Sequence, residues 1–164
     1  MKKLISLLAA GMMLLGALTA CGSSDKDSGS ESVSAILDAS EAYKSRSMDA
    51  AAKSLRNAME AALTDADNRG GYDISKPIVI VSYGYTNCTD NELHNYLMKG
   101  VQNYYDAINK LDYVIVIEKG SCIYTAVSSI KDSKNVGIYS SENCPYTFSG
   151  NTVSEIAEDV KSKI

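Results

Sequence analysis

The residues with the most scope for chemistry are the cysteines, and Cys88 is the one placed most like a nucleophile. It comes just before a predicted helix and shortly after a predicted strand, which is how thiol enzymes present a catalytic cysteine. Free amides and the dipole at a helix N-terminus lower a thiol pKa, but Asp90 and Glu92 oppose the thiolate with their negative charge. The nearest base is His94, the only histidine in the chain. Cys88 is therefore a candidate reactive thiol, and a structural or partner-bound thiol is the alternative.

Two further cysteines lie along the second predicted hairpin, Cys122 at the start of its first strand and Cys144 just beyond its second. If Ile130 faces Asn135 across the turn, Cys122 faces Asn143, so Cys144 lies within one residue of Cys122 across the strands. A disulfide is geometrically reasonable at that spacing, and such bonds persist in exported proteins. It would close a loop of about twenty residues and stabilise the fold by roughly 3 kcal/mol. We predict a Cys122–Cys144 bridge, with two buried reduced thiols as the alternative.

Other common kinds of site lack the residues that they need. One histidine excludes the usual histidine-based metal sites and leaves a Ser-His-Asp triad dependent on His94 alone. The stretch 82–85 has a single glycine, so it is not a phosphate-binding loop. Asp25 and Asp27 lie outside any EF-hand frame. We predict no metal, no cofactor and no catalytic centre.

The aromatic composition is unusual, with 11 tyrosines, one phenylalanine and no tryptophan. Tyrosine offers a flat apolar face and a hydroxyl, which suits recognition of a protein or a glycan. The candidate binding surface consists of Tyr83, Tyr85 and Tyr146. The alternative is that these are half-buried structural residues with the hydroxyl at the surface.

The first 20 residues have the pattern of an export signal. Lys2 and Lys3 precede an apolar run over 4–18, and small residues follow it. The run is shorter than the roughly 20 residues that a membrane-spanning helix needs. We therefore predict a cleaved signal peptide over 1–20.

The end of this segment, Leu18-Thr19-Ala20-Cys21, resembles the lipobox of bacterial lipoproteins. In that family the chain is cut before the cysteine, whose sulfur carries diacylglycerol. The resemblance implies lipidation of Cys21 and a stable membrane anchor on the extracytoplasmic side, because two or three acyl chains hold more firmly than one. An ordinary secretory signal with a cysteine nearby is the alternative.

A Ser-rich segment follows the predicted lipidation site. Residues 22–32 contain no apolar side chain, so we predict a flexible tether over 21–32. Without Lys2 and Lys3 the chain has 14 Lys and Arg against 20 Asp and Glu, a net charge of about −6. An acidic chain has no electrostatic attraction for nucleic acid or anionic headgroups. We expect no nucleic-acid partner, and we expect the lipid to hold the protein at the membrane.

Residues 33–164 are predicted to form one α+β domain, with helices first and last and an antiparallel sheet between them. Helical periodicity extends from Ser32 to Asp67 and weakens at 45–47, which leaves two helices or one kinked helix as alternatives. The apolar side of this segment is rich in alanine, which lets another element pack closely. The apolar stretch 78–81 indicates a buried strand that runs on towards Tyr83 and Tyr85. A Thr-x-x-Glu capping box at 89–92 then opens a second helix, whose apolar residues extend from Leu93 to Leu111.

The C-terminal half is predicted to begin with three short strands, at 113–117, 122–130 and 136–140. The turns between them are tight, which makes neighbouring strands antiparallel and forms a meander. A second capping box, at 152–155, opens a C-terminal helix.

Two segments of this domain resemble type IV pilin-like proteins of Gram-positive anaerobes. Residues 51–70, AAKSLRNAMEAALTDADNRG, resemble the exposed half of their long first helix. Residues 112–141 resemble their head-domain meander, in which a Val-Gly-x-Tyr strand packs on that helix. Pilins have a type III leader and an apolar stem where this chain has a lipid and a tether. The resemblance implies a pilin-like head on a lipid anchor, and assembly through the usual stem does not follow from it.

Two hypotheses of function result. The first is a lipid-anchored extracytoplasmic surface protein that acts as a non-catalytic binding or assembly domain, with a protein or glycan partner. The second is a small extracytoplasmic thiol enzyme or redox protein that uses Cys88. A Cys88→Ser variant separates them, because only the second loses its activity.

Overall fold

The structure is a computed structural model that describes residues 29–130 and 133–164. The predicted signal peptide, Cys21 and most of the predicted tether lie outside these residues. The compact folded unit extends from Ile36 to Ile164, and residues 29–35, which are helical, belong to a separate unit.

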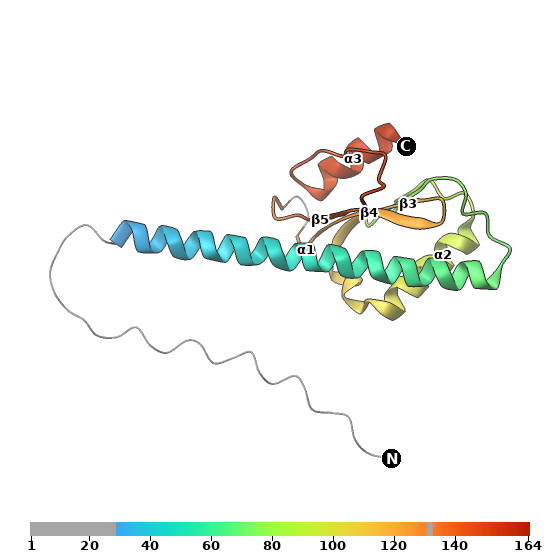
Figure 1. Cartoon of the computed structure of the whole chain (residues 1–164), viewed down its shortest axis with the longest axis horizontal. Coiled ribbons are helices and arrows are strands. Elements are labelled where there is room, and N and C mark those ends of the chain that lie inside the picture. The colour runs from blue at the N-terminus through green and yellow to red at the C-terminus, as the bar shows by residue number, and fades with distance from the viewer. Residues whose placement is uncertain (1–28, 131–132) are drawn as a thin grey trace, which may run out of the picture. The chain divides into compact units, whose positions relative to one another are not determined.

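The described residues form three α-helices, one short 3₁₀ helix and five strands (Figure 1). In chain order they are α1 (Gly29–Arg69), β1 (Ile78–Val81), β2 (Tyr85–Thr86), α2 (Asn91–Tyr104), η1 (Asp106–Lys110), β3 (Asp112–Glu118), β4 (Ser121–Ser128), β5 (Gly137–Ser140) and α3 (Val153–Lys163). The strands make one antiparallel sheet in the order β2-β1-β3-β4-β5. The predicted α+β class and the β3-β4-β5 meander are confirmed.

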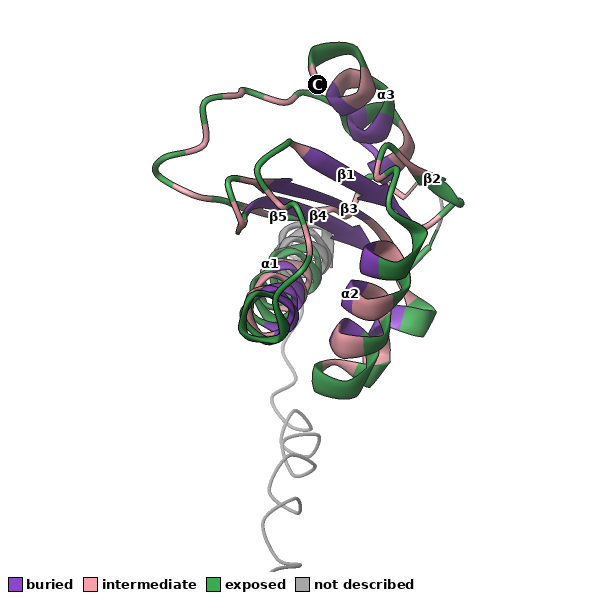
Figure 2. Ribbon diagram, turned by 90° about the vertical axis from the view of Figure 1, so that its right-hand side faces the viewer, coloured by how far each residue is buried: buried purple, intermediate pink, exposed green. Residues whose placement is uncertain are grey.

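The sheet is covered on both faces, with α1 and α2 on one and α3 on the other (Figure 2). Alternation along the strands divides the side chains between two cores. In β1, Ile78 and Ile80 face α1 and α2, whereas Val79 and Val81 face α3. Because both faces are buried, β1 is a continuous apolar run of four residues, which is why its position was readable from the sequence.

Helix α1 is one uninterrupted helix through 45–47, where the sequence had suggested a break. It ends where Gly70 adopts a positive φ of 72° and donates its N–H to the Ala66 carbonyl at 3.1 Å. The small alanine side chains on the buried side of α1 let α2 approach closely. At Gly100 of α2, an added Cβ would lie only 2.7 Å from the Ala62 Cβ. Residues 39–47, in contrast, are all exposed.

Polar contacts from α1 fix the helix on the sheet. The buried Thr125 hydroxyl donates to the Ala52 carbonyl at 2.9 Å, and the Cys122 N–H donates to the Glu60 carboxylate at 3.0 Å. Glu60 also pairs with Arg56 at 3.3 Å. These bonds set the position of α1 along β4.

The second helix differs from the prediction at both ends. Its N-cap is Asp90, not Thr89, because the Asp90 carboxylate accepts the N–H groups of Glu92 and Leu93 at 2.9 and 3.0 Å. It ends at Tyr104, and the residues that follow form η1 instead of continuing the helix. At α3 the predicted cap is present, since Thr152 accepts the Glu155 N–H. Among the described residues, no helix is both long and apolar enough to cross a membrane.

Candidate functional site

Two of the predicted surface tyrosines lie together on the β1–β2 hairpin, at the edge of the sheet. The turn closes through the Gly84 N–H, which donates to the Val81 carbonyl at 3.1 Å, and Gly84 has a φ of 84° that favours glycine. The side chains of Tyr83 and Tyr85 are 41% and 37% exposed. The hairpin therefore presents two aromatic rings to solvent on a short, well-defined turn.

Helix α3 supports these rings from one side. The Ser154 hydroxyl lies 3.5 Å from the Tyr83 hydroxyl, and the Lys161 ammonium lies 4.5 Å from the centre of the Tyr85 ring. Ser154 and Lys161 are seven residues apart, so they share one side of the helix. A cation over the face of an aromatic ring is attracted by the ring quadrupole. We call Tyr83, Tyr85, Ser154 and Lys161 the hairpin surface.

Ser154 and Lys161 are not among the residues predicted from the sequence for the binding surface. The sequence pattern could have identified them, because both lie on the polar side of a short amphipathic helix whose other side is buried. What the sequence did not show is that this polar side lies against the β1–β2 hairpin.

The third predicted tyrosine, Tyr146, does not join the hairpin surface. It lies on the loop between β5 and α3 and stacks on Phe148, with ring centres 5.5 Å apart. The centre of the Phe148 ring in turn lies 5.9 Å from the Lys163 ammonium nitrogen. Lys161 and Lys163 are two residues apart and point to opposite sides of α3. The predicted set of three is therefore divided by α3 into a pair and a single residue.

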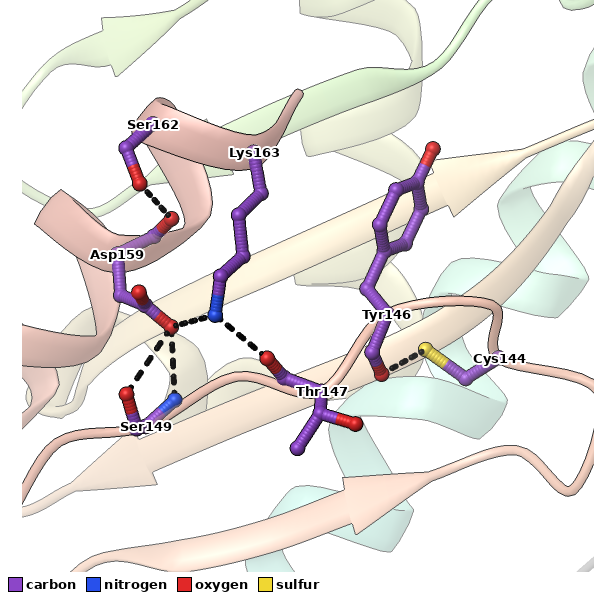
Figure 3. Close-up of polar contacts among 7 residues, drawn as sticks. All are labelled: Cys144, Tyr146, Thr147, Ser149, Asp159, Ser162 and Lys163. Carbon is purple, nitrogen blue, oxygen red and sulfur yellow. Dashed lines mark hydrogen bonds and ion pairs between the residues drawn. The ribbon is translucent and has the colours of Figure 1, made fainter.

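The loop that carries Tyr146 is fastened to α3 by one carboxylate (Figure 3). Asp159 accepts hydrogen bonds from the Ser149 N–H at 2.8 Å and from the Lys163 ammonium at 2.8 Å. Lys163 also donates to the Thr147 carbonyl at 2.6 Å. The bond from Lys163, followed by the bond from Ser149, lowers the pKa of Asp159. This network gives the loop a structural role.

Cys88 lies in the position that the sequence predicted, but its surroundings do not activate it. Burial raises the pKa of the Cys88 thiol, and the Asp90 carboxylate adds to the increase. The thiol donates to the Asp90 carbonyl at 3.3 Å. Nδ1 of His94 is buried without a hydrogen-bond partner in the described part of the chain, and the hydrogen bond from the Cys88 thiol goes to a carbonyl, not to this imidazole. The geometry is that of a protonated thiol fixed at a helix start.

We expect Cys88 to react slowly with iodoacetamide near neutral pH, because only the thiolate attacks and a raised pKa makes it scarce. The alkylation rate of Cys88 should rise about tenfold per pH unit. In the folded protein this rise should continue above the pH at which the rate for the denatured chain becomes constant. Mass spectrometry of the Cys88 peptide follows the reaction, with the denatured chain as the control. Fast modification at pH 6 that stays constant up to pH 8 would instead show a lowered pKa.

Cys122 and Cys144 are free thiols in the structure, on opposite faces of the sheet. Cys122 is buried in the core beneath α1, whereas Cys144 packs against the core beneath α3. Strands β4 and β5 pair one residue away from the register that we assumed, with Thr125 opposite Tyr139, and a one-residue shift moves side chains to the other face. Burial also raises the pKa of the Cys122 thiol. The bridge stays a prediction, which non-reducing peptide mapping tests by a linked Cys122–Cys144 fragment.

Two open grooves in the described part of the chain are candidate sites. The larger open groove, of about 580 Å³, lies between the end of α1, the loop before β1 and the β3–β4 turn. Its Asp73 carboxylate accepts the Ser75 N–H at 3.1 Å and the Ser75 hydroxyl at 2.6 Å, which makes a local turn. Within the described residues, no three or more His, Cys, Asp or Glu side chains are grouped so that they would hold a metal ion.

Comparison with known proteins gives no matching family model, no similar curated protein and no similar solved structure.

Proposed function

We propose that this chain is a lipid-anchored surface protein on the extracytoplasmic side of a bacterial cell membrane, with a folded part that is a non-catalytic, pilin-like binding head. The anchor is proposed at Cys21, from the lipobox pattern of residues 18–21. The hairpin surface is proposed as the binding site, with a protein or a glycan as the partner.

The observation that carries the binding role is the exposure of Tyr83 and Tyr85 beside Lys161. Tyrosine and basic side chains are enriched at recognition surfaces, where a rigid ring contributes contact area at a low cost in conformational entropy. The rings belong to a tight turn and contact α3, so this surface is organised before a partner arrives. Preorganisation of this kind favours affinity.

The alternative, a thiol enzyme, has less support from the geometry. A catalytic thiol needs a lowered pKa or a base within hydrogen-bond reach. Burial and Asp90 raise the pKa of Cys88 instead. We therefore assign Cys88 a structural role at the start of α2.

We expect Tyr85→Ala to weaken partner binding by ~1–2 kcal/mol, which is roughly a 5- to 30-fold increase in Kd. The full chain, purified in detergent, is applied to a panel of immobilised glycans and to intact bacterial cells, and each probe that it binds is titrated with every variant. Tyr83→Ala should act in the same direction, since both rings belong to the hairpin surface.

Two matched variants make the test specific. Ile138→Ala removes another exposed apolar side chain, 43% exposed, from β5 at the opposite edge of the sheet, and should leave binding unchanged. Cys88→Ser should also bind normally. If both tyrosine variants bind as well as the original chain, the hairpin surface is not the site. Substrate turnover that Cys88→Ser abolishes would replace the proposal with the enzyme hypothesis.

A further inference from the structure

Helix α1 has a second long face, away from the sheet, that the described elements leave mostly open; only Tyr104 and Tyr105, at the end of α2, lie beside it. Its side chains are small and uncharged and recur at alternating steps of three and four residues: Ser47, Ala50, Ser54, Asn57, Ala61 and Thr64. All of them are exposed except Ala61, which is half-buried. We call these six residues the α1 stripe.

The polar groups of the α1 stripe are already partly satisfied within the helix. The Ser54 hydroxyl donates to the Ala50 carbonyl, and the Thr64 hydroxyl donates to the Glu60 carbonyl, both at 2.9 Å. Burying a hydroxyl is costly mainly when it loses its hydrogen bond. Small side chains also allow two helix axes to approach closely. The α1 stripe is therefore suited to contact with another helix.

The charges beside the α1 stripe are arranged by sign along the helix. Lys44 and Arg46 flank its N-terminal end, and Asp65 and Asp67 flank its C-terminal end; all four are exposed. Arg46 and Asp67 are 21 residues apart, which is three repeats of seven, so they lie on the same flank of the α1 stripe. Lys44 and Asp65 have the same spacing and lie on the other flank. One Asp65 oxygen accepts the Tyr104 hydroxyl at 2.7 Å, which leaves its other oxygen available.

These four charges pair with those of a second, identical helix only when that helix runs in the opposite direction. We propose that α1 pairs antiparallel with α1 of a second copy of this chain, through the α1 stripe. A two-fold axis near residues 55–56 sets Ser54 opposite Asn57 and Ala50 opposite Ala61. Arg46 then lies beside Asp67 of the second copy, and Lys44 beside its Asp65. Parallel helices would bring basic ends together and acidic ends together.

Two further features of α1 agree with this arrangement. Residues 39–47 are exposed on all sides, with Tyr43 76% exposed, and an isolated helical segment is only marginally stable in water. In the pair, these turns would contact the C-terminal turns of α1 in the second copy. An open groove of about 380 Å³ also follows the stripe, bounded by Tyr104 and Tyr105, and can receive side chains of the second helix. A two-fold contact closes on itself, so the product is a dimer and not a filament.

Cysteine cross-linking tests the direction of the pair. Full-length Ala50→Cys/Ala61→Cys is oxidised in isolated membranes, and peptide mapping should find residue 50 of one copy linked to residue 61 of the other. Ala50→Cys alone should give no 50–50 link, because an antiparallel pair separates those positions by about 16 Å along the axis. A 50–50 link means a parallel pair, and absence of the 50–61 link means no such pair; either result overturns the proposal.

Charge exchange gives an independent test on purified full-length protein in detergent, by sedimentation equilibrium. Arg46→Glu should weaken self-association about tenfold, because it places like charges together at two symmetric positions. Adding Asp67→Arg to the same chain restores opposite charges and should recover the original affinity within about twofold. Lys99→Glu, an exposed charge reversal on α2, is the matched control and should change nothing. A double variant no better than Arg46→Glu, or a wild type that stays monomeric at all concentrations, contradicts the antiparallel pair.

Discussion

Cys21→Ala is expected to remove all fatty-acid label from this protein. The lipobox resemblance places the diacylglyceryl group on the Cys21 sulfur, and alanine has no nucleophile to accept it. The protein should then leave the membrane fraction, since the acidic chain has no basic patch to hold it at anionic lipid. Growth of cells with a clickable fatty acid, followed by capture and gel analysis of each variant, measures the label directly.

The control for this experiment is Cys144→Ala, which removes another cysteine but leaves the lipobox unchanged. It should retain full label and stay with the membrane. Label that persists in Cys21→Ala would mean that another residue is acylated. A protein that is unlabelled but still membrane-bound would mean that the N-terminal segment remains uncleaved.

The parts of the fold that the sequence predicted well are those whose pattern is set locally. Ile78–Val81 is apolar at every position because both faces of β1 are buried, and its start was predicted correctly. The expected continuation towards Tyr83 and Tyr85 was wrong, because the chain turns back at Gly84 and Tyr85 belongs to β2. The meander followed from short turns, which leave antiparallel pairing as the only option for neighbouring strands. The alanine-rich buried side of α1 likewise indicated close packing, which the close approach of Gly100 to Ala62 confirms.

The parts that the sequence did not predict depend on longer-range geometry. The β4–β5 register was assumed from residue spacing alone, with Ile130 opposite Asn135, and an error of one residue changes which face a side chain occupies. A register shift between Val116 and Ile117 adds to this on the other side of β4. The division of the three tyrosines depends on where α3 crosses the sheet, which no local pattern encodes. The pKa of Cys88 depends on how deeply the helix start is buried. From the sequence, the helix start favours a lower pKa and Asp90 and Glu92 favour a higher one, so the direction could not be decided.

Gly137→Val is expected to lower the free energy of unfolding by about 3 kcal/mol or more, near the upper end for overpacked sites. Gly137 is buried on β5, where the strand lies directly against the backbone of α1. A Cβ at this position would overlap the Met48 carbonyl group and the Asp49 nitrogen. Backbone atoms in a helix cannot rotate away as a side chain does, so either β5 or α1 must move. The movement would also break the bond from the Ile138 N–H to the Asp49 carboxylate, at 3.2 Å.

Urea unfolding of the full chain, followed by circular dichroism, measures the effect, and the midpoint should fall by roughly 1–2 M. Ser140→Val is the matched control on the same strand, because Ser140 is exposed and valine suits a strand. Gly137→Ala should fall between the control and Gly137→Val. If Gly137→Val unfolds at the same urea concentration as Ser140→Val, β5 does not lie against α1 in solution. The orientation of α1 on the sheet, which leaves the α1 stripe exposed to a second copy, would then also differ from the one described.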